Sequence, residues 1–273
     1  MSPTTITNFS SIIDRYDSVL LDLWGVVHDG TSVYPGAKEC FKQMKQMGKK
    51  VVIISNAPRR AAKAQAVLDQ LGIDRDLYQG LYTSGEVAYQ YMQQGAFGGM
   101  QRYLFIGPER DADVLDGLGK QKVESLKEAD FLLNVGFGSE QDEVAHVSAL
   151  LSQAKDLELP MLCLNPDMHV VKITGERYEC AGVIAKEYES FGGIVHYFGK
   201  PYPHIYDMAY TSLGKPSKDK ILMVGDGLNT DIRGAVSFGV DSLLITGGIL
   251  QGSEAIEFEE ESSPSYVAPS WSW

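Results

Sequence analysis

Two apolar runs that end in carboxylates, far apart in the chain, constrain this sequence most. The first run, residues 19–21, precedes Asp22, and the second, residues 221–224, precedes Gly225 and Asp226. Runs this short and this apolar are typical of strands that are buried on both faces of a parallel sheet. Ligands bind at the carboxyl ends of such strands, so we expect Asp22 and Asp226 to lie together at one edge of a sheet.

Short apolar strands alternate with helical patterns along most of the chain, and this alternation predicts a parallel α/β sheet. The predicted strands are residues 19–21, 51–54, 81–83, 103–106, 131–135, 161–164, 221–224 and 242–245. The predicted helices are residues 36–47, 59–71, 85–92, 110–118, 142–152, 181–191, 203–213 and 230–238.

Two glycine-rich breaks divide the alternating pattern. Three glycines fall within residues 94–99, and Gly192-Gly193 forms the second break. The stretch between the breaks has its own strand–helix alternation. The pattern therefore favours a smaller inserted α/β domain over one continuous large sheet. We predict a discontinuous Rossmann-like core of residues 1–97 and 195–273, and an inserted α/β cap domain of residues 98–194.

Composition and charge exclude several classes of protein. The 273 residues include 24 basic and 36 acidic side chains, a net charge of −12, which argues against a general binder of nucleic acid or of anionic membranes. Three widely spaced cysteines, Cys40, Cys163 and Cys180, do not form a disulfide or zinc framework. The N-terminal residues lack an apolar signal segment, and no run reaches transmembrane length. We expect a cytoplasmic protein.

Polar and charged side chains gather at four predicted strand ends. They are Asp22, Ser55 with Asn56, Lys200, and Asp226 with Asp231. An exposed carboxylate can attack phosphorus, hydroxyl and amide groups can donate to phosphate oxygens, and a lysine can supply positive charge. The remaining carboxylates suit a hard cation such as Mg²⁺. Each residue alone has a structural explanation, as a turn residue, a helix cap or a solvated side chain. Their common position at strand ends favours a phosphoryl-transfer site.

The series of motifs resembles the haloacid dehalogenase superfamily of phosphohydrolases, and within it the class IIA branch, which has a large α/β cap inserted after the second motif. The resemblance extends from about residue 19 to residue 248. Besides the two apolar runs with their carboxylates, the segments that carry it are Ser55-Asn56-Ala57-Pro58-Arg59, Leu164-Asn165-Pro166-Asp167-Met168-His169, Ala181-Gly182, Gly199-Lys200-Pro201 and Thr230-Asp231-Ile232-Arg233-Gly234-Ala235.

The resemblance implies a nucleophile and a metal site. Asp22 would be both the nucleophile and a Mg²⁺ ligand. The backbone carbonyl of Trp24 and the carboxylate of Asp226 would be further ligands, and Asp231 would assist. The implied reaction is Mg²⁺-dependent hydrolysis of a phosphate monoester through an aspartyl-phosphate on Asp22.

The resemblance also implies how a small phosphorylated metabolite would bind. Ser55 and Lys200 would hold the transferring phosphoryl group, and Asn56 would orient its loop. The cap loop that closes over the substrate would carry Asn165, Asp167 and His169. A structural role for His169 in the cap is equally open. Caps of this branch often mediate dimers, so a homodimer is expected.

Trp24 departs from the family pattern. Phosphatases of the family have a second aspartate at this position, which acts as general acid and base, whereas indole exchanges no proton at neutral pH. The loss is expected to slow hydrolysis of alkyl phosphates by about 10² to 10⁴. Three interpretations stay open. His28 could substitute for the acid, although neighbouring Asp29 favours a turn; the substrate could have a good leaving group; or the chain could be a catalytically weak binding protein for phosphorylated metabolites. Dehalogenases also lack the second aspartate, but the metal carboxylates argue against that activity.

The C-terminal segment, residues 251–273, differs in composition from the rest. An acidic run is followed by Tyr266, Trp271 and Trp273. The sequence leaves two expectations open: a solvated, partly disordered tail, or aromatic side chains that dock on the body or on a second subunit.

Overall fold

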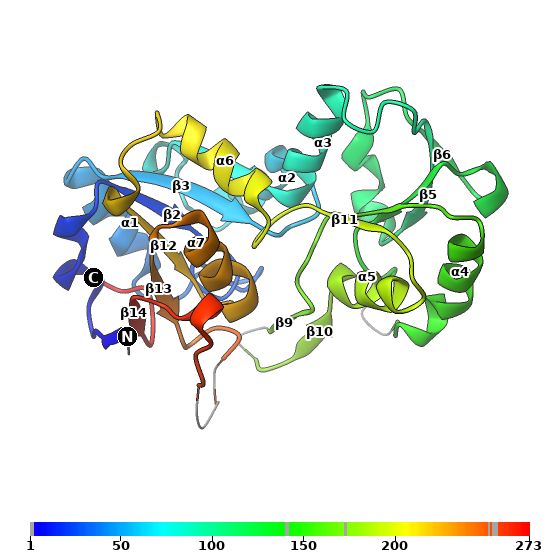
Figure 1. Ribbon diagram of the computed structural model, residues 1–273. Helices are drawn as coiled ribbons and strands as arrows, with labels where there is room; N and C mark the ends of the chain where they lie inside the picture. The colour runs from blue at the N-terminus through cyan, green and yellow to red at the C-terminus, as the bar shows by residue number, and fades with distance from the viewer. Residues whose placement is uncertain (1–2, 140–141, 172–173, 251, 253–255) are drawn as a thin grey trace.

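The computed structural model describes residues 3–139, 142–171, 174–250, 252 and 256–273. Figure 1 shows two sheets side by side, each with helices packed on it. The strands are β1 (Thr4–Thr5), β2 (Ser18–Leu21), β3 (Lys50–Ser55), β4 (Gly80–Thr83), β5 (Arg102–Ile106), β6 (Gln121–Val123), β7 (Phe131–Asn134), β8 (Met161–Cys163), β9 (His169–Val171), β10 (Arg177–Glu179), β11 (Val195–Tyr197), β12 (Ile221–Gly225), β13 (Asp241–Ile245) and β14 (Tyr266–Ala268). The α-helices are α1 (Ala37–Gln46), α2 (Ala61–Gln70), α3 (Ser84–Gln93), α4 (Ala145–Asp156), α5 (Ala181–Ser190), α6 (Pro203–Ser212) and α7 (Arg233–Phe238).

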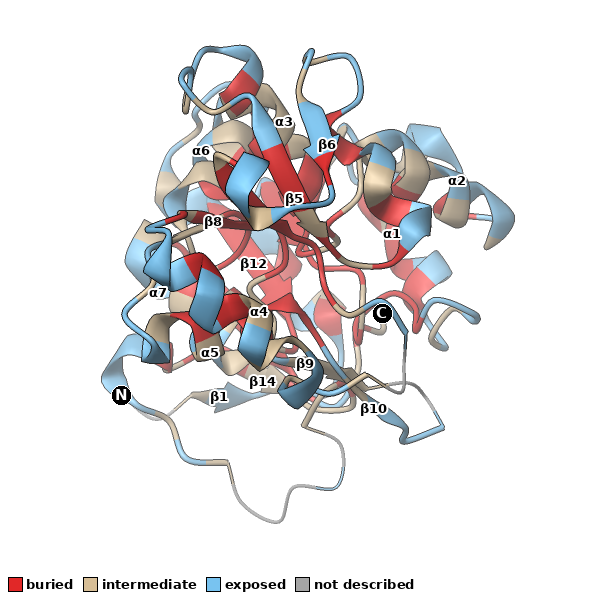
Figure 2. Cartoon of the chain, turned by 90° about the vertical axis from the view of Figure 1, so that its right-hand side faces the viewer, coloured by how far each residue is buried: buried red, intermediate tan, exposed pale blue. Residues whose placement is uncertain are grey.

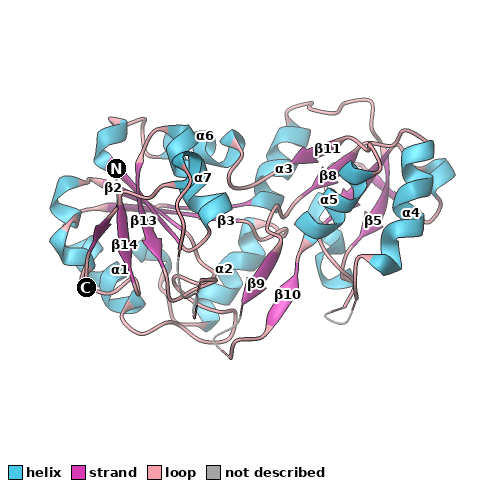
Figure 3. Cartoon of the chain, turned by 60° about the horizontal axis from the view of Figure 1, so that its bottom comes forward, coloured by secondary structure: helices cyan, strands magenta, loops and turns pink. Residues whose placement is uncertain are grey.

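The larger sheet is parallel and has seven strands in the order β1-β14-β13-β12-β2-β3-β4. The second sheet is parallel and has five strands in the order β11-β8-β7-β5-β6. Strands β9 and β10 form a separate antiparallel pair. In Figures 1 and 3 this pair lies between the two sheets, and both chain termini lie on the side of the larger one.

Apolar side chains on both faces of the larger sheet explain its buried position. Val19 and Leu21 of β2 pack into one hydrophobic cluster, whereas Leu20 between them packs into the cluster on the opposite face. Successive strand residues point to opposite faces, so an uninterrupted apolar strand needs a layer on each side. Figure 2 shows the buried residues concentrated along the strands, beneath half-buried and exposed helices.

The sheet topology places the carboxylates at a switch point. From the central strand β2 the chain proceeds to β3 and β4 on one side, and later returns through β12 and β13 on the other. Ligand sites in open α/β sheets lie where the strand order reverses, outside the carboxyl ends of the strands. Asp22 follows β2 directly and Asp226 follows β12, so both carboxylates leave the sheet at this point.

The structure confirms the predicted fold class, a Rossmann-like parallel-sheet core with a smaller inserted α/β cap, and contains all eight predicted strands. Two local predictions were wrong. Residues 109–115 form a 3-10 segment rather than the predicted α-helix over 110–118. Strand β11 pairs with β8 of the inserted sheet, although the predicted boundary at 194/195 assigned it to the core. The division into two domains otherwise stays a prediction.

Within its described part, residues 252 and 256–273, the C-terminal tail docks on the body of the same chain. β14 pairs with β13 and β1, and the backbone amide of Phe9 donates to the carbonyl of Ser272 at 2.8 Å. Trp271 is 1% exposed, and its ring makes an edge contact with Phe41 at a centroid distance of 5.0 Å. Tyr266 and Trp271 therefore belong to the core, and the half-buried Trp273 packs against it. No helix within the described ranges is long and apolar enough to cross a lipid bilayer.

Replacing Trp271 with alanine is expected to lower the free energy of unfolding by about 3 kcal/mol, because it removes a fully buried indole. Urea denaturation followed by circular dichroism measures this. Val236→Ala, at a side chain that is 39% exposed, serves as the control and should shift the free energy by less than about 0.5 kcal/mol. An unchanged midpoint for Trp271→Ala would mean that the tail is not part of the folded core.

Candidate active site

Asp22, Lys200 and Asp231 form the centre of the site. The Lys200 ammonium lies 2.5 Å from Asp22 Oδ1 and 2.7 Å from Asp231 Oδ1, and all three side chains are at least nine-tenths buried. Lys200 therefore contacts two carboxylates: that of Asp22, which follows β2, and that of Asp231, in the segment that follows β12. A buried charge needs a partner, and this arrangement fixes the direction in which the Asp22 carboxylate points.

The acidic side chains fit a divalent cation. Carboxylate oxygens of Asp22, Asp226 and Asp231 lie within 4.8 Å of one another, and all three residues are buried. Gly25, at φ +82°, gives Asp226 room, because a Cβ there would lie 1.9 Å from its Oδ2. The backbone amide of Ile249 donates to that oxygen at 2.7 Å. An all-oxygen ligand set is what Mg²⁺ prefers, so the residues present fit this ion.

The charges of the site also fit a bound divalent cation. Burial raises the pKa of Asp22 to about 7, and the nearby Asp231 adds to the rise, although Lys200 opposes it. Burial together with the neighbouring Asp22 and Asp231 raises the pKa of Asp226 well above its usual range. One lysine thus does not balance three buried carboxylates, and a bound cation would stabilise their ionised forms.

Asn56 joins the two parts of the site. Its Oδ1 accepts from the Lys200 amide at 2.7 Å, and its Nδ2 donates to the Lys200 carbonyl at 3.0 Å and to Asp167 Oδ1 at 2.8 Å. Ser55, at the end of β3, accepts from the backbone amide of Ala57 at 3.3 Å. Burial raises the pKa of Asp167 to about 6. Asn56 therefore contacts both the loop of Lys200 and the cap loop.

The predicted residues line one cavity of about 500 Å³ between the core and the cap. Those that line it are Asp22, Trp24, His28, Ser55, Asn56, Asn165, Asp167, His169, Lys200, Asp226 and Asp231. The structure thus brings all of the predicted site residues to one place. Their individual roles stay predictions.

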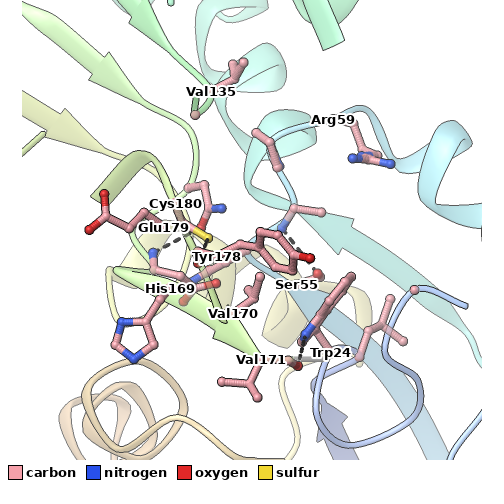
Figure 4. A pocket seen from close by; sticks show the side chains of 18 of the residues that line it. Trp24, Ser55, Arg59, Val135, His169, Val170, Val171, Tyr178, Glu179 and Cys180 are labelled. Carbon is pink, nitrogen blue, oxygen red and sulfur yellow. Dashed lines mark hydrogen bonds between the residues drawn. The ribbon is translucent and has the colours of Figure 1, made fainter. Parts of the chain in front are cut away.

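Trp24 is half-buried, and its indole points across the cavity to the cap. Its Nε1 donates to the carbonyl of Val171 in β9 at 2.9 Å, the dashed line beside Trp24 in Figure 4. No described residue donates a hydrogen bond to the Trp24 backbone carbonyl, so that oxygen is available to a metal. Trp24 thus donates a hydrogen bond from the loop after β2 to the cap.

The geometry argues against His28 as a substitute acid. Its Nδ1 accepts from the amide of Gly30 at 2.9 Å, and burial lowers its pKa to about 4. The ring is therefore neutral at pH 7 and a weak base. Asp29 Oδ1 accepts from the amides of Thr31 and Ser32, which is the turn role expected for that residue.

His169 and Asn165 contribute to the cap loop. The His169 Nδ1 lies 2.8 Å from Arg177 Nη2 across the β9–β10 pair, and in Figure 4 the ring points away from Trp24 and Ser55. Asn165 Oδ1 accepts from the amide of Asp167 at 3.0 Å. These contacts support structural roles for both residues, while contact with a substrate stays a prediction.

Several further residues line the cavity, and the sequence alone did not indicate them. They are Arg59, Arg110, Asp111, Tyr178 and Glu179. The Arg59 Nη2 lies 3.4 Å from the buried Asp111 carboxylate of the cap. Arg59 is the last residue of the segment that begins at Ser55, and its place in that segment could have marked it as a site residue. Tyr178 and Glu179 lie on a strand of only three residues, which leaves no apolar run to detect.

Comparisons with known proteins show similarity in two stretches of the chain. A profile described as haloacid dehalogenase-like hydrolase matches residues 19–121, and one described as HAD-hydrolase-like matches residues 197–272. The first match covers β2 to β4 of the larger sheet and extends through β5 of the second sheet, and the second match covers β12 to β14. Over these two stretches the chain is similar to haloacid dehalogenase-like hydrolases.

Several known proteins match nearly the whole chain, and their names describe phosphatases or hydrolases. The sugar-phosphatase AraL of Bacillus subtilis is 26% identical over 266 residues, 92% of this chain and 89% of its own. The D-glycerol 3-phosphate phosphatase of Mycobacterium tuberculosis is 26% identical over 266 residues, 94% of this chain and 70% of its own. The crystal structure of a haloacid dehalogenase-like hydrolase from Brucella suis superposes with a TM-score of 0.86 at 29% identity and covers 96% of this chain and 98% of its own.

Proposed function

We propose that this chain hydrolyses phosphate monoesters of small metabolites with the help of Mg²⁺ and through an aspartyl-phosphate on Asp22. The observation that carries the proposal is the Lys200 ammonium between Asp22 and Asp231, within a cluster of three buried carboxylates at the switch point of the sheet. The relatives named for sugar phosphate and glycerol phosphate support this substrate class.

The chain's own residues account for the first step. The Asp22 carboxylate attacks phosphorus, and the bond from phosphorus to the leaving-group oxygen breaks. Ser55 and Lys200 hold the phosphoryl oxygens in place, and Lys200 also favours the ionised form of the attacking carboxylate. When bound, Mg²⁺ supplies positive charge against the phosphoryl oxygens. Water then hydrolyses the acyl phosphate, which releases inorganic phosphate and restores Asp22.

The leaving group distinguishes this site from a site with two aspartates. The indole of Trp24 has no proton to give, and its N–H is already bound to Val171. His28 accepts a hydrogen bond and is a weak base. We therefore propose that efficient substrates have leaving groups that depart without protonation, such as acyl or aryl phosphates. The class IIA assignment, a homodimer and a cytoplasmic location stay predictions from the sequence.

A panel of substrates tests the proposal through steady-state release of phosphate. With Mg²⁺, p-nitrophenyl phosphate and acetyl phosphate should turn over about 10² to 10⁴ times faster than sugar phosphates or nucleoside monophosphates, because only alkyl esters need the missing acid. Excess EDTA should abolish release, and added Mg²⁺ should restore it. Equal rates for a sugar phosphate and p-nitrophenyl phosphate would mean that another residue donates the proton. A ligand that raises the melting temperature and is never consumed would instead favour the alternative, a weakly catalytic protein that binds phosphorylated metabolites.

A further inference from the structure

The β9–β10 pair is a small ribbon that covers the cavity. Each strand has three residues, and no other strand of the described residues pairs with them. Residues of both strands line the cavity, among them Val170 and Tyr178. A two-stranded hairpin alone is marginally stable in water. Its position over the site must therefore come from contacts with the rest of the molecule.

One end of the ribbon is fixed to the cap. The amide of Cys180 donates to the Met168 carbonyl at 2.9 Å, and the amide of Gly182 in α5 donates to the Asp167 carbonyl at 3.1 Å. The other end reaches the core, where the Val171 carbonyl accepts from the Trp24 indole at 2.9 Å. The Trp24 contact is thus a direct link between the ribbon and the loop of the nucleophile, two residues after Asp22 (Figure 4).

The loop of Trp24 also supports the indole from the side of the core. The Leu23 carbonyl accepts from the amides of Val27 and His28 at 2.8 and 3.0 Å, which closes a tight turn around Trp24. Gly30, at φ +92°, passes under the ring, since a Cβ there would lie 2.7 Å from the Trp24 Cζ3. The donor is therefore preformed, and it presents a fixed N–H to the ribbon.

We propose that Trp24 is a positioning residue, which holds the β9–β10 ribbon over the leaving-group side of the cavity by its hydrogen bond to Val171. Trp24, two residues after the nucleophile, then limits which leaving groups fit, where an aspartate at this position would protonate them. The inference rests on the proposed function for its effect on substrates. The link between the indole and the ribbon stands on the contacts alone.

Trp24→Phe tests the link, because it keeps an aromatic ring and removes the N–H. Amide hydrogen exchange is measured by mass spectrometry in Mg²⁺ and inorganic phosphate. The loss of one hydrogen bond should speed exchange in β9 and β10 about 3- to 10-fold and leave exchange in β7 and β8 unchanged. Trp271→Phe is the matched control, since the buried Trp271 Nε1 has no hydrogen-bond partner among the described residues. It should not change exchange in the ribbon.

Kinetics separate positioning from a general loss of structure. For Trp24→Phe, the KM for p-nitrophenyl phosphate should rise by about the same 3- to 10-fold, and more than the KM for acetyl phosphate, whose small leaving group reaches less of the ribbon. Equal changes for both substrates would overturn the specificity role. Equal ribbon exchange in Trp24→Phe and wild type would overturn the link itself.

A second variant, in the loop beneath the indole, tests the same hydrogen bond between Trp24 and Val171. Gly30→Ala should displace the indole and speed ribbon exchange as Trp24→Phe does. Gly214→Ala, at φ +81° with no atom within 4 Å of the added Cβ, controls for backbone strain alone. If both site variants change ribbon exchange but wild type releases no phosphate from any substrate, the proposed function fails and the positioning contact stands.

Discussion

Replacing Asp22 with asparagine is expected to reduce Mg²⁺-dependent phosphate release by at least about 10³-fold, because the amide cannot attack phosphorus. The side chain keeps its shape and its place after β2, so the fold should persist. Its partner Lys200 still contacts Asp231 at 2.7 Å. The loss should therefore appear in kcat rather than in the amount of folded protein.

The matched control is Asp14→Asn, at an exposed carboxylate of the core away from the cavity. It carries the same chemical change and should keep the wild-type rate. Circular dichroism spectra and melting temperatures of both variants establish that they are folded. Wild-type turnover in Asp22→Asn would remove the nucleophile from the mechanism proposed here.

Replacing Lys200 with methionine is expected to lower the free energy of unfolding by about 4 kcal/mol in EDTA and to abolish turnover. The change leaves three buried carboxylates without their cation, and breaking a buried ion pair from one side is strongly destabilising. Part of the loss should return in Mg²⁺, because the metal offsets the same negative charge. The deficit relative to wild type should thus be larger in EDTA than in Mg²⁺.

Lys186→Met provides the comparison for this prediction. The Lys186 ammonium also lies 2.7 Å from a carboxylate, that of Glu189, but its side chain is 61% exposed. Removing it should change the free energy of unfolding by less than about 1 kcal/mol, since surface pairs contribute little. Urea denaturation of both variants, with EDTA and with Mg²⁺, measures the difference. A Lys200→Met deficit that Mg²⁺ leaves unchanged would argue against a cation at the three carboxylates.

Most strands of the two parallel sheets were predictable, because an uninterrupted apolar run of this length fits few structures other than a strand buried on both faces. Val19 to Leu21 and Val51 to Ile54 are buried on both faces, and their sequences require this. The short strands were not predictable. β9 and β10 have three residues each, with mixed polarity and burial, so neither length nor periodicity marks them.

The features of the site also divide into those that the sequence predicts and those that it does not. Asp22, Ser55, Lys200 and Asp226 were predictable because each follows an apolar strand or loop whose end faces the switch point. Contacts between the core and the cap were not, since they depend on how the two parts pack. The bond from Trp24 to Val171 joins residues that are far apart in sequence, and nothing in either segment alone indicates it.

Chemical trapping tests the central claim most directly. Wild-type protein is mixed with Mg²⁺ and acetyl phosphate or p-nitrophenyl phosphate, quenched in acid during turnover, and reduced with borohydride, which converts an aspartyl-phosphate to homoserine. Peptide mass spectrometry then locates the modified residue. We expect homoserine at position 22 in the presence of Mg²⁺ and unmodified aspartate there in EDTA. Steady phosphate release with the modification at another residue, or at none, would contradict an aspartyl-phosphate on Asp22.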